Sequence, residues 1–499
     1  MTTKRSLASI AAVAVLAVSN ATFADVKLPA IIGDNMVLQT GQNVPIWGTA
    51  EPGEKIEVRI NAPGSSTNAE VDNVAEDTRV EQTQADDQGN WRVTFKPMEA
   101  SAEPVSVVIT GANKITLQNV LLGDVWACSG QSNMEWSVAR SDNPEEEIQN
   151  AKHPKIRLFQ VQKVVSSDKP LDDTVGKWVE CSPETIANFS AVAYYFGRDL
   201  QEFTGQPVGL IQTAWGGTPA EAWTSQEKLE SLEIVAPVLE RWKTMVEKDE
   251  SAKSNPHHSA GLFNGMINPI IPFAIKGAIW YQGESNASRA FQYRTLFPEM
   301  ITDWRARWEQ GDFPFLFVQL ANFRDRKDEP AESDWAELRE AQSKTLELPA
   351  TGQAVIIDIG EAGDIHPRNK QDVGRRLALA ARHVAFGDED VVYSGPTFQD
   401  VEFAEGKAVL TFENVGGGLK AEGEALKGFS IAGEDKKFHC ASATIEDNQV
   451  VVQSDAVAKP VAVRYAWADN PEATLYNAEG LPASPFRTDE WPGVTDEAR

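Results

Sequence analysis

Four clusters of small and polar residues, each placed directly after an apolar run, contain the residue types that nucleophilic catalysis needs. The first cluster holds Ser132, which follows Gly130 in a predicted tight turn between a strand and a helix. Such a turn projects the serine hydroxyl into a cleft, while backbone N–H groups at the helix start face a developing anion. A serine hydroxyl is a weak nucleophile until a base removes its proton, and that base is usually histidine. Ser132 is therefore the predicted nucleophile.

One of the six histidines lies where a base for Ser132 is expected. His366 follows the last of the apolar runs and precedes Pro367 in a predicted loop. A His-Pro pair in a loop is by itself more often structural, so the prediction depends on its position beside the other clusters. The remaining histidines lie in loops, in an amphipathic helix or in the C-terminal region: His153, His257, His258, His383 and His439. His366 is therefore the predicted general base.

The clusters after the second and third apolar runs offer hydrogen-bond donors for an oxyanion. Gly216 and Gly217 form a predicted tight turn whose backbone N–H can approach a substrate oxygen, and Gln282 offers a side-chain amide. Each such donor typically lowers the barrier by roughly 3 kcal/mol, a hundredfold or more in rate. Glu284 and Asn286 follow Gln282 closely and either take part in catalysis or brace the loop.

A parallel sheet would bring these clusters together. The apolar runs at 125–128, 208–214, 277–281, 315–320 and 354–359 have the near-continuous hydrophobicity of strands buried on both faces. Amphipathic helical patterns lie between them, which predicts right-handed βαβ units. The carboxyl ends of parallel strands meet at one edge of the sheet, where ligands bind. We therefore expect an α/β domain over residues 121–395, with a parallel five-stranded sheet flanked by helices in three layers.

The flanking regions favour β structure. Residues 25–120 hold short alternating runs separated by Gly, Asn and Asp, which are typical of strands and turns. Similar runs return over residues 396–499. We predict a β-sandwich-like region at each end of the α/β domain. The predicted strands are 55–60, 90–95, 105–110, 408–412, 428–432, 450–453 and 462–467.

The first 24 residues have the order of a secretory signal peptide. Lys4 and Arg5 precede an apolar run at 7–18, and Ala24 stands at the expected cleavage point. The run is too short for a permanent membrane anchor. We therefore expect a periplasmic or secreted protein whose mature chain begins near Asp25.

The charge composition of the chain excludes some classes of binding partner. The chain has 499 residues, with 46 basic against 73 acidic side chains and a net charge of −27. This balance argues against nucleic acid or an anionic membrane surface as partner, because both require Lys- and Arg-rich surfaces. Cys128, Cys181 and Cys440 have no zinc-type spacing and permit at most one disulfide. Nothing in the sequence indicates an oligomeric state.

Several of these segments resemble the ordered motifs of the sialate O-acetylesterase family, a branch of the SGNH hydrolases. The similarity extends from 34–39 near the predicted mature start to 465–471 and 481–487 near the end, and so covers essentially the whole mature chain. The segments at the active edge are 130–134 (Gly-Gln-Ser-Asn-Met), 215–219 (Trp-Gly-Gly-Thr-Pro), 280–286 (Trp-Tyr-Gln-Gly-Glu-Ser-Asn) and 364–367 (Asp-Ile-His-Pro).

The resemblance implies an SGNH-type (flavodoxin-like) esterase that needs no metal or other cofactor. It would remove acetyl groups from sugar hydroxyls through an acyl-serine intermediate. The backbone at Ser132 and at Gly216 or Gly217, with the side chain of Gln282, would form the oxyanion hole, and Asn286 is the second choice for the side-chain donor. The superfamily's Asp three residues before the histidine is here Gly363. Asp364, two residues before, would orient the imidazole and complete a triad, or a backbone carbonyl would do so and leave a Ser–His dyad.

The motifs do not distinguish between several possible substrates. Candidate substrate contacts are Gln131, Trp215, Glu284 and Arg368. Sialic acid and the acetylated plant polysaccharides xylan and xyloglucan are both possible substrates, and a non-catalytic carbohydrate-binding protein is the alternative of another class. Trp136, Trp215, Trp223 and Trp280 either stack on sugar rings or belong to the core, and the arginines available for a substrate carboxylate are Arg140, Arg324 and Arg368.

Overall fold

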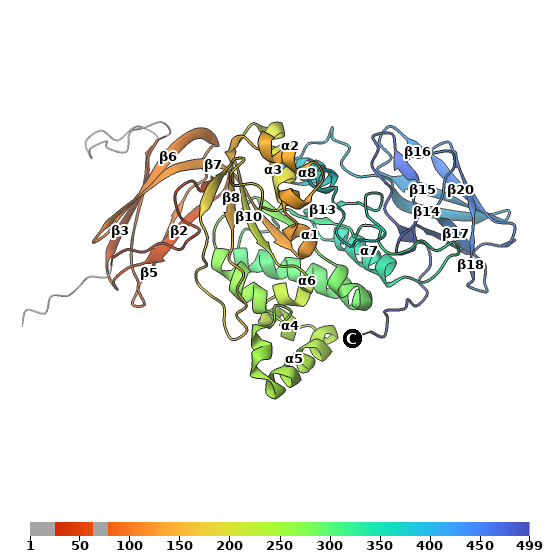
Figure 1. Ribbon diagram of the computed structural model, residues 1–499, viewed down its shortest axis with the longest axis horizontal. Coiled ribbons are helices and arrows are strands. Elements are labelled where there is room, and N and C mark those ends of the chain that lie inside the picture. Colours follow the sequence, from red (N-terminus) through yellow and green to blue (C-terminus); the bar gives the residue numbers. More distant parts are fainter. Residues whose placement is uncertain (1–24, 63–77, 499) are drawn as a thin grey trace, which may run out of the picture.

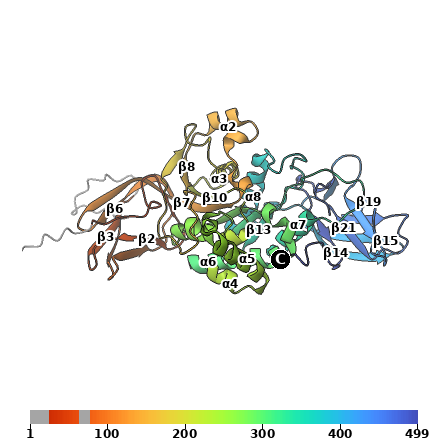
Figure 2. The ribbon, with the colours of Figure 1, turned by 60° about the horizontal axis from the view of Figure 1, so that its bottom comes forward.

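The computed structural model describes residues 25–62 and 78–498. Three regions follow one another along the longest axis: an N-terminal β region, a central α/β region and a C-terminal β region (Figures 1 and 2). The predicted signal peptide over residues 1–24 lies outside the described residues. Within the described chain, none of the helices combines the length and the apolar character that crossing a membrane requires.

The central sheet places the predicted clusters at one edge. Its strand order is β13-β12-β11-β7-β10-β8-β9, and every neighbouring pair is parallel except β8 with β9. The strands are β7 (Lys114–Gly130), β8 (His153–Gln160), β9 (Trp178–Cys181), β10 (Val208–Ala214), β11 (Gly277–Tyr281), β12 (Phe315–Val318) and β13 (Thr351–Ala354). β7 is central, and its last residue, Gly130, pairs with Ala214 on one side and Tyr281 on the other. The first three predicted clusters therefore begin side by side.

Helices cover both faces of this sheet, as the apolar strands require (Figure 1). Trp126 and Cys128 of β7 share one hydrophobic cluster with α3 and α8, whereas Val125 and Ala127 share another with α6 and α7. Successive side chains of a strand point to opposite faces, so the two helix pairs lie on opposite sides. The helices are α1 (Ser132–Glu135), α2 (Pro144–Asn150), α3 (Ala191–Thr204), α4 (Gln226–Glu230), α5 (Ala236–Lys248), α6 (Ala290–Trp308), α7 (Asp334–Lys344) and α8 (Lys370–Phe386).

Two details of the predicted sheet were wrong. The parallel part contains six strands in the described chain instead of five, because β8 joins it beside β10. The fifth predicted strand, 354–359, is shifted: β13 spans Thr351–Ala354. The apolar residues Val355 and Ile357 that suggested a longer strand pack instead in the hydrophobic core of the C-terminal region.

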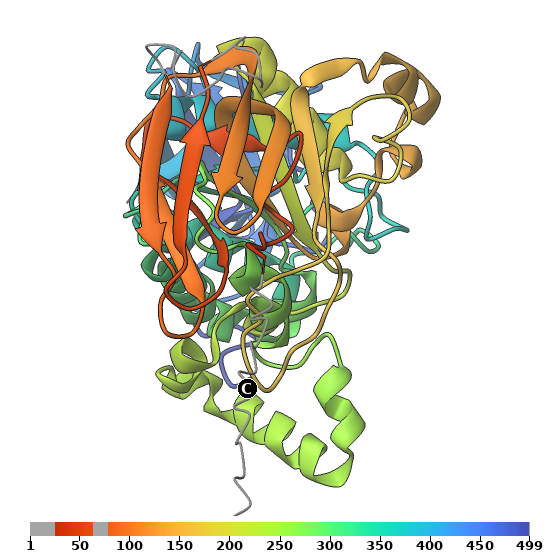
Figure 3. The same ribbon diagram turned by 90° about the vertical axis from the view of Figure 1, so that its left-hand side faces the viewer.

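β7 joins the N-terminal region to the central sheet without a linker (Figure 3). Its first half pairs with β6 and β1, and from Asp124 onward it pairs with β10. The predicted boundary at 120/121 therefore falls within a strand. The N-terminal strands are β1 (Val37–Gln39), β2 (Val44–Thr49), β3 (Lys55–Ile60), β4 (Arg79–Gln84), β5 (Asn90–Phe95) and β6 (Ser101–Thr110).

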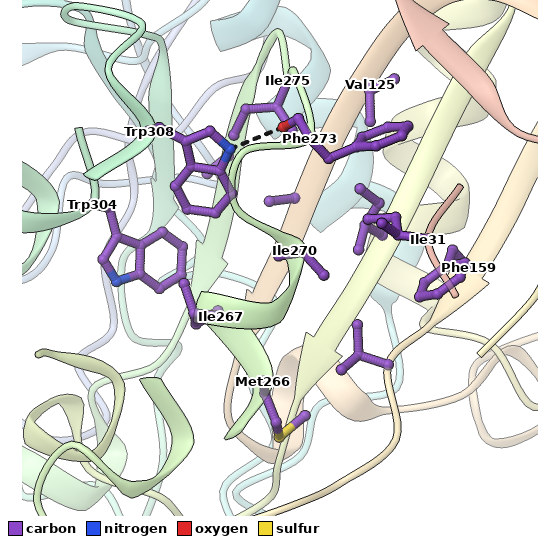
Figure 4. Close-up of a cluster of buried hydrophobic side chains, with 14 of the residues drawn as sticks. Ile31, Val125, Phe159, Met266, Ile267, Ile270, Phe273, Ile275, Trp304 and Trp308 are labelled. Carbon is purple, nitrogen blue, oxygen red and sulfur yellow. Dashed lines mark hydrogen bonds between the residues drawn. The ribbon is translucent and has the colours of Figure 1, made fainter. Parts of the chain in front are cut away.

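One hydrophobic cluster continues from the N-terminal strands into the central region. Figure 4 shows part of it, where Trp304 and Trp308 of α6 lie on one side of the segment carrying Ile270, and Val125 of β7 lies on the other. The Trp308 indole N–H donates to the Phe273 carbonyl at 3.0 Å. This shared core stabilises the arrangement of the two regions.

The C-terminal region has a hydrophobic core of its own. Its strands are β14 (Thr397–Ala404), β15 (Lys407–Glu413), β16 (Leu419–Ala421), β17 (Phe429–Ala432), β18 (Phe438–Cys440), β19 (Ser442–Glu446), β20 (Gln449–Gln453), β21 (Ala462–Tyr465), β22 (Leu475–Asn477) and β23 (Phe486–Arg487). The tail after β23 returns to the central region, where the Thr495 N–H and hydroxyl donate to the buried Glu337 of α7.

The three cysteines are free thiols. Cys128 and Cys181 are buried in β7 and β9, and Cys440 is exposed in β18. Cys128 therefore packs as a small apolar residue, although it lies only four residues before Ser132.

Candidate active site

Ser132 and His366 are in contact although 234 positions separate them in the chain. Ser132 is the first residue of α1, directly beyond the end of β7. His366 lies in the loop between β13 and α8. The His366 Nε2 is 2.9 Å from the Ser132 Oγ, a hydrogen-bond distance that suits proton transfer.

The turn that presents Ser132 depends on Gly130. This residue has φ +142°, and a Cβ added to it would lie 2.2 Å from the Tyr281 carbonyl oxygen of β11. No side chain fits there, so glycine allows β7 and β11 to remain paired up to the turn. The Gln131 N–H then donates to the Tyr281 carbonyl at 3.0 Å and fixes the start of α1.

Asp364 and Trp136 hold the His366 ring. The Asp364 Oδ1 lies 3.1 Å from the His366 Nδ1 and accepts the His366 backbone N–H at 2.9 Å. These hydrogen bonds, with the backbone one first, lower the pKa of Asp364, which is therefore ionised at neutral pH. The Asp364 side chain is 51% exposed, unlike a buried triad carboxylate. Trp136 stacks on the imidazole, with ring centroids 5.0 Å apart.

The two glycines after β10 lie beside Ser132 but differ in their hydrogen bonding. A Cβ on Gly216 would lie 3.2 Å from the Ser132 Cβ, so a larger residue would crowd the nucleophile. The Gly216 N–H donates at 2.6 Å to Glu135, whose carboxylate also pairs with Lys163. Across the described chain, the Ser132 and Gly217 N–H groups make no hydrogen bond within the protein. Both amides therefore remain free to donate to a ligand.

Gln282 and Asn286 have other partners. The Gln282 side chain is fully buried, with its amide N–H groups directed to the Thr218 carbonyl and to Asn286, while its oxygen accepts the Tyr293 hydroxyl at 2.9 Å. The Asn286 amide donates to Glu221 at 2.9 Å. Both side chains brace the loop after β11, which argues against Gln282 and Asn286 as oxyanion donors.

The residues expected to touch substrate divide into two groups. Gln131 is buried, and its side-chain oxygen accepts the Ser285 N–H at 3.3 Å, while Glu284 accepts a hydrogen bond from Asn133. Both contacts tie the loop after β11 to α1. Trp215 is half-buried at the end of β10, and Arg368 is exposed and paired with Glu361 at 3.2 Å.

A cavity of about 290 Å³ opens beside Ser132 and His366. Its wall includes Trp136 and Arg140, together with the side chains of Gln160, Asn188 and Gln212. The volume is near the lower end for small-molecule sites, about 300–1,000 Å³. Planar amides beside an aromatic ring suit a ligand rich in hydroxyl groups.

Of the four tryptophans near the motifs, Trp223 and Trp280 are fully buried in the core, and Trp136 is the one that lines this cavity. Arg324 is paired with Asp334 and Asp469 and does not line this cavity.

Sequence reasoning missed the amide wall of the cavity. Gln160 ends β8, which was not recognised as a strand because it begins with the polar and proline-containing His153-Pro154-Lys155. Asn188 lies in a loop before α3, and no local pattern distinguishes it. Asn133 and Lys370 were also missed, although they stand next to Ser132 and four residues after His366, and their proximity to the motif residues was the available signal.

The described residues contain no group of three or more His, Cys, Asp or Glu side chains arranged to hold a metal ion.

Comparison with known proteins identifies the family. The family model of carbohydrate esterases described as sialic acid-specific acetylesterase matches residues 122–382. The sialate O-acetylesterase of Homo sapiens is 30% identical over 513 residues, covering 94% of each chain. The sialate O-acetylesterase of Mus musculus is 29% identical over 92% of this chain and 94% of its own.

A solved structure is similar along nearly the whole chain. A carbohydrate acetylesterase from Xanthomonas citri superposes with a TM-score of 0.82 at 42% identity, covering 94% of this chain and 100% of that chain. A serine, a glycine turn and a histidine thus meet on three strand-end loops. They do so in a chain whose carbohydrate esterase relatives cover 92–94% of its length. The chain belongs to the sialic acid-specific acetylesterase family of carbohydrate esterases, and it is a carboxylic ester hydrolase.

Proposed function

We propose that this protein is a serine esterase that removes O-acetyl groups from a carbohydrate, sialic acid or a related acetylated sugar, through an acetyl-serine intermediate. The observation that carries the proposal is the 2.9 Å contact between the His366 Nε2 and the Ser132 Oγ beside a polar cavity. The family's relation to acetylated sugars supports the substrate class.

The first half of the reaction acylates Ser132. The His366 Nε2 accepts the hydroxyl proton while the Ser132 Oγ bonds to the acetyl carbonyl carbon. Negative charge develops on the carbonyl oxygen, and the N–H groups of Ser132 and Gly217 are the proposed donors to it. Histidinium then returns its proton to the sugar oxygen as the ester C–O bond breaks, which releases the deacetylated sugar.

The second half repeats the same proton transfers with water. His366 takes a proton from a water molecule, whose oxygen attacks the acetyl-serine carbonyl carbon. Collapse of this second tetrahedral species returns the proton to the Ser132 Oγ and releases acetate. No step requires a metal or another cofactor.

We infer an SGNH-type (flavodoxin-like) hydrolase architecture for the central region. Serine, glycine and histidine on three loops at the carboxyl edge of a parallel sheet support it. The asparagine that usually serves as side-chain donor in the broader SGNH superfamily falls nearest Ser285 in this sequence. The Ser285 hydroxyl instead donates to the Gly217 carbonyl at 2.8 Å. Ser285 thereby fixes the Gly217 turn, and the oxyanion hole we propose consists of backbone amides.

Asp364 is proposed to orient His366, with a modest energetic role. Asp364→Asn keeps an oxygen acceptor for the imidazole N–H, and an exposed ion pair contributes about 1 kcal/mol at most. We therefore expect kcat to fall about fivefold or less, since 1 kcal/mol is about a factor of five in rate. Steady-state kinetics on 4-nitrophenyl acetate measures the change. A loss as large as that of His366→Ala would instead establish a full triad.

A panel of esters tests the function and selects the sugar. Acetate release is measured from 4-nitrophenyl acetate, O-acetylated sialic acid, acetylated xylan and acetylated xyloglucan, with Ser132→Ala as the blank. Ser132-dependent release from O-acetylated sialic acid is the expected result. Release from a plant polysaccharide alone would reassign the substrate, and the absence of Ser132-dependent release from every ester would favour a carbohydrate-binding protein.

Arg140 supports an acidic sugar as substrate. It lines the cavity, and within the described chain no carboxylate lies close enough to form an ion pair with it. Because a hydrogen bond to a charged group is worth about 1.5–3 kcal/mol, Arg140→Gln should raise KM for O-acetylated sialic acid about tenfold. KM for 4-nitrophenyl acetate should stay unchanged.

Arg368→Gln is the matched control for Arg140→Gln, because Arg368 is bound to Glu361 and does not line the cavity. An Arg140→Gln enzyme with an unchanged KM for the acidic substrate would remove the argument for a carboxylate-bearing sugar.

We also propose export from the cytoplasm, on the basis of the N-terminal sequence pattern. Mass spectrometry of the mature protein tests this proposal, with a chain beginning near Asp25 as the expected result.

A further inference from the structure

A buried polar cluster lies directly behind the two proposed catalytic side chains. Asn133 follows Ser132 in α1, Lys370 begins α8, and Glu284 begins the short 3₁₀ helix after β11 (Glu284–Arg289). Asn133 is 1% exposed and Lys370 is 0% exposed. Burying a charged or amide side chain is costly unless it is hydrogen-bonded, so such a cluster requires an explanation.

Asn133 is the centre of this cluster, with hydrogen bonds to three separate segments. Its amide nitrogen donates to the Glu284 Oε1 at 2.5 Å and to the Ile365 carbonyl at 3.0 Å. Its oxygen accepts from the Lys370 Nζ at 2.6 Å. Both amide hydrogens and the amide oxygen are therefore in use.

These contacts connect the nucleophile directly to the histidine loop. Asn133 is covalently adjacent to Ser132, and Ile365 is covalently adjacent to His366. The Asn133–Ile365 hydrogen bond therefore runs beside the Ser132–His366 contact and limits how far the two segments can separate. Asp364 holds His366 from within its own loop, whereas Asn133 holds that loop against α1.

Lys370 and Glu284 are opposite charges whose burial outweighs their mutual attraction. Burial lowers the pKa of Lys370 to about 7, and Glu284, Asp364 and Glu361 oppose this shift while Arg140 reinforces it. Burial likewise raises the pKa of Glu284. The Lys370 Nζ also lies 5.3 Å from the centroid of the Tyr281 ring. The ammonium group thus faces acidic groups and an aromatic ring, although burial outweighs their effect on its pKa.

We propose that Asn133, Lys370 and Glu284 form a positioning network that fixes His366 relative to Ser132. This inference rests on the proposed function, in which Ser132 and His366 carry out the reaction. Glu284 and Lys370 fix the Asn133 amide in one orientation, and Asn133 fixes the Ile365 carbonyl. Because a misplacement of about 1 Å can cost about a hundredfold in rate, the network affects turnover without touching the substrate.

Two nearly isosteric variants test the network. Asn133→Asp keeps an acceptor for Lys370 but replaces both donors with an oxygen that faces Glu284 and the Ile365 carbonyl. Lys370→Met removes the ammonium group and keeps the side-chain length. We expect each to lower kcat about a hundredfold on 4-nitrophenyl acetate, with KM within about threefold of wild type. Glu284→Gln retains an acceptor for Asn133 but removes the charge near Lys370, so kcat should fall, though less than in the other two variants.

Arg376→Met is the matched control for a merely structural effect. Arg376 lies in the same helix as Lys370 and is buried, but its hydrogen bonds go to Asp358 and the Val355 carbonyl and to none of the network residues. This variant should lower the melting temperature but leave kcat of the folded enzyme within about twofold. Circular dichroism confirms folding for every variant, and Asn133→Asp serves as the test if Lys370→Met does not fold.

The outcomes separate this inference from the proposed function. Retention of wild-type kcat by folded Asn133→Asp and Lys370→Met, with Ser132→Ala inactive, would overturn the network and leave the esterase mechanism in place. A raised KM with unchanged kcat would also overturn it, because the cluster would then contact substrate. Activity in Ser132→Ala would instead refute the proposed function.

Discussion

Ser132→Ala is expected to lower kcat for ester hydrolysis by roughly 10⁵-fold while leaving the protein folded. Removal of a serine nucleophile from a comparable enzyme abolishes covalent catalysis, and the remaining rate comes from the oxyanion hole and substrate binding. Ser132 contributes little to packing, since its hydroxyl contacts His366 at the cavity. Acetate release and thermal unfolding, measured on the same preparation, separate the loss of activity from any loss of stability.

The matched control for this variant is Ser285→Ala. Ser285 lies at the same edge of the sheet, and its hydroxyl donates to the Gly217 carbonyl instead of to His366. A smaller loss is expected, because the change removes one hydrogen bond and leaves the nucleophile in place. Wild-type activity in purified Ser132→Ala would refute the assignment, and mass spectrometry of protein quenched during turnover should find the acetyl group on Ser132 alone.

His366→Ala is expected to cause a loss of similar size, roughly 10⁵-fold in kcat, because Ser132 then has no base. The His366 ring stacks on Trp136 at the cavity, and its side chain is 28% exposed. Its removal therefore leaves a solvent-accessible space against the Trp136 ring. Added imidazole should enter this space and restore part of the activity, with a rate that increases with imidazole concentration.

Two further variants test whether the loss in His366→Ala is specific to the proposed pair of Ser132 and His366. His383→Ala removes a histidine of α8 whose ring stacks on that of Tyr393, with centroids 3.9 Å apart, and should leave kcat unchanged. The double variant Ser132→Ala with His366→Ala should be no slower than either single variant, because the two residues act as one unit. If the two losses multiplied instead, Ser132 and His366 would act in separate steps, and the proposed proton transfer would be wrong.

The sequence was sufficient to locate the strands whose hydrophobicity is a local property. The predicted strands at 208–214 and 277–281 coincide with β10 and β11, because both strands are buried on both faces and are bounded by turn residues. Ser132 and His366 could be paired from the sequence because the ends of parallel strands meet at one edge. Their contact at 2.9 Å agrees with that expectation.

Tertiary structure decided which polar side chains line the cavity and which brace the loops. Gln282 has the chemistry of an oxyanion donor, but Thr218, Asn286 and Tyr293 occupy its hydrogen-bonding groups. A residue type fixes how many hydrogen bonds a side chain can make, whereas its partners come from segments far away in the chain.

The difference between local pattern and long-range contacts also explains why one strand and two buried polar residues were not predicted. β8 begins with polar residues and belongs to the sheet because it pairs in parallel with β10. Val355 and Ile357, which were predicted to lie in the fifth strand, pack in the hydrophobic core of the C-terminal region. Asn133 and Lys370 are ordinary polar residues in the sequence, and only the approach of α1 to α8 gives them a common hydrogen bond. The local pattern determined the strands that are apolar throughout and the residues proposed to react. Long-range packing determined the register, the partners and the supporting network, because their energies depend on contacts that no short segment contains.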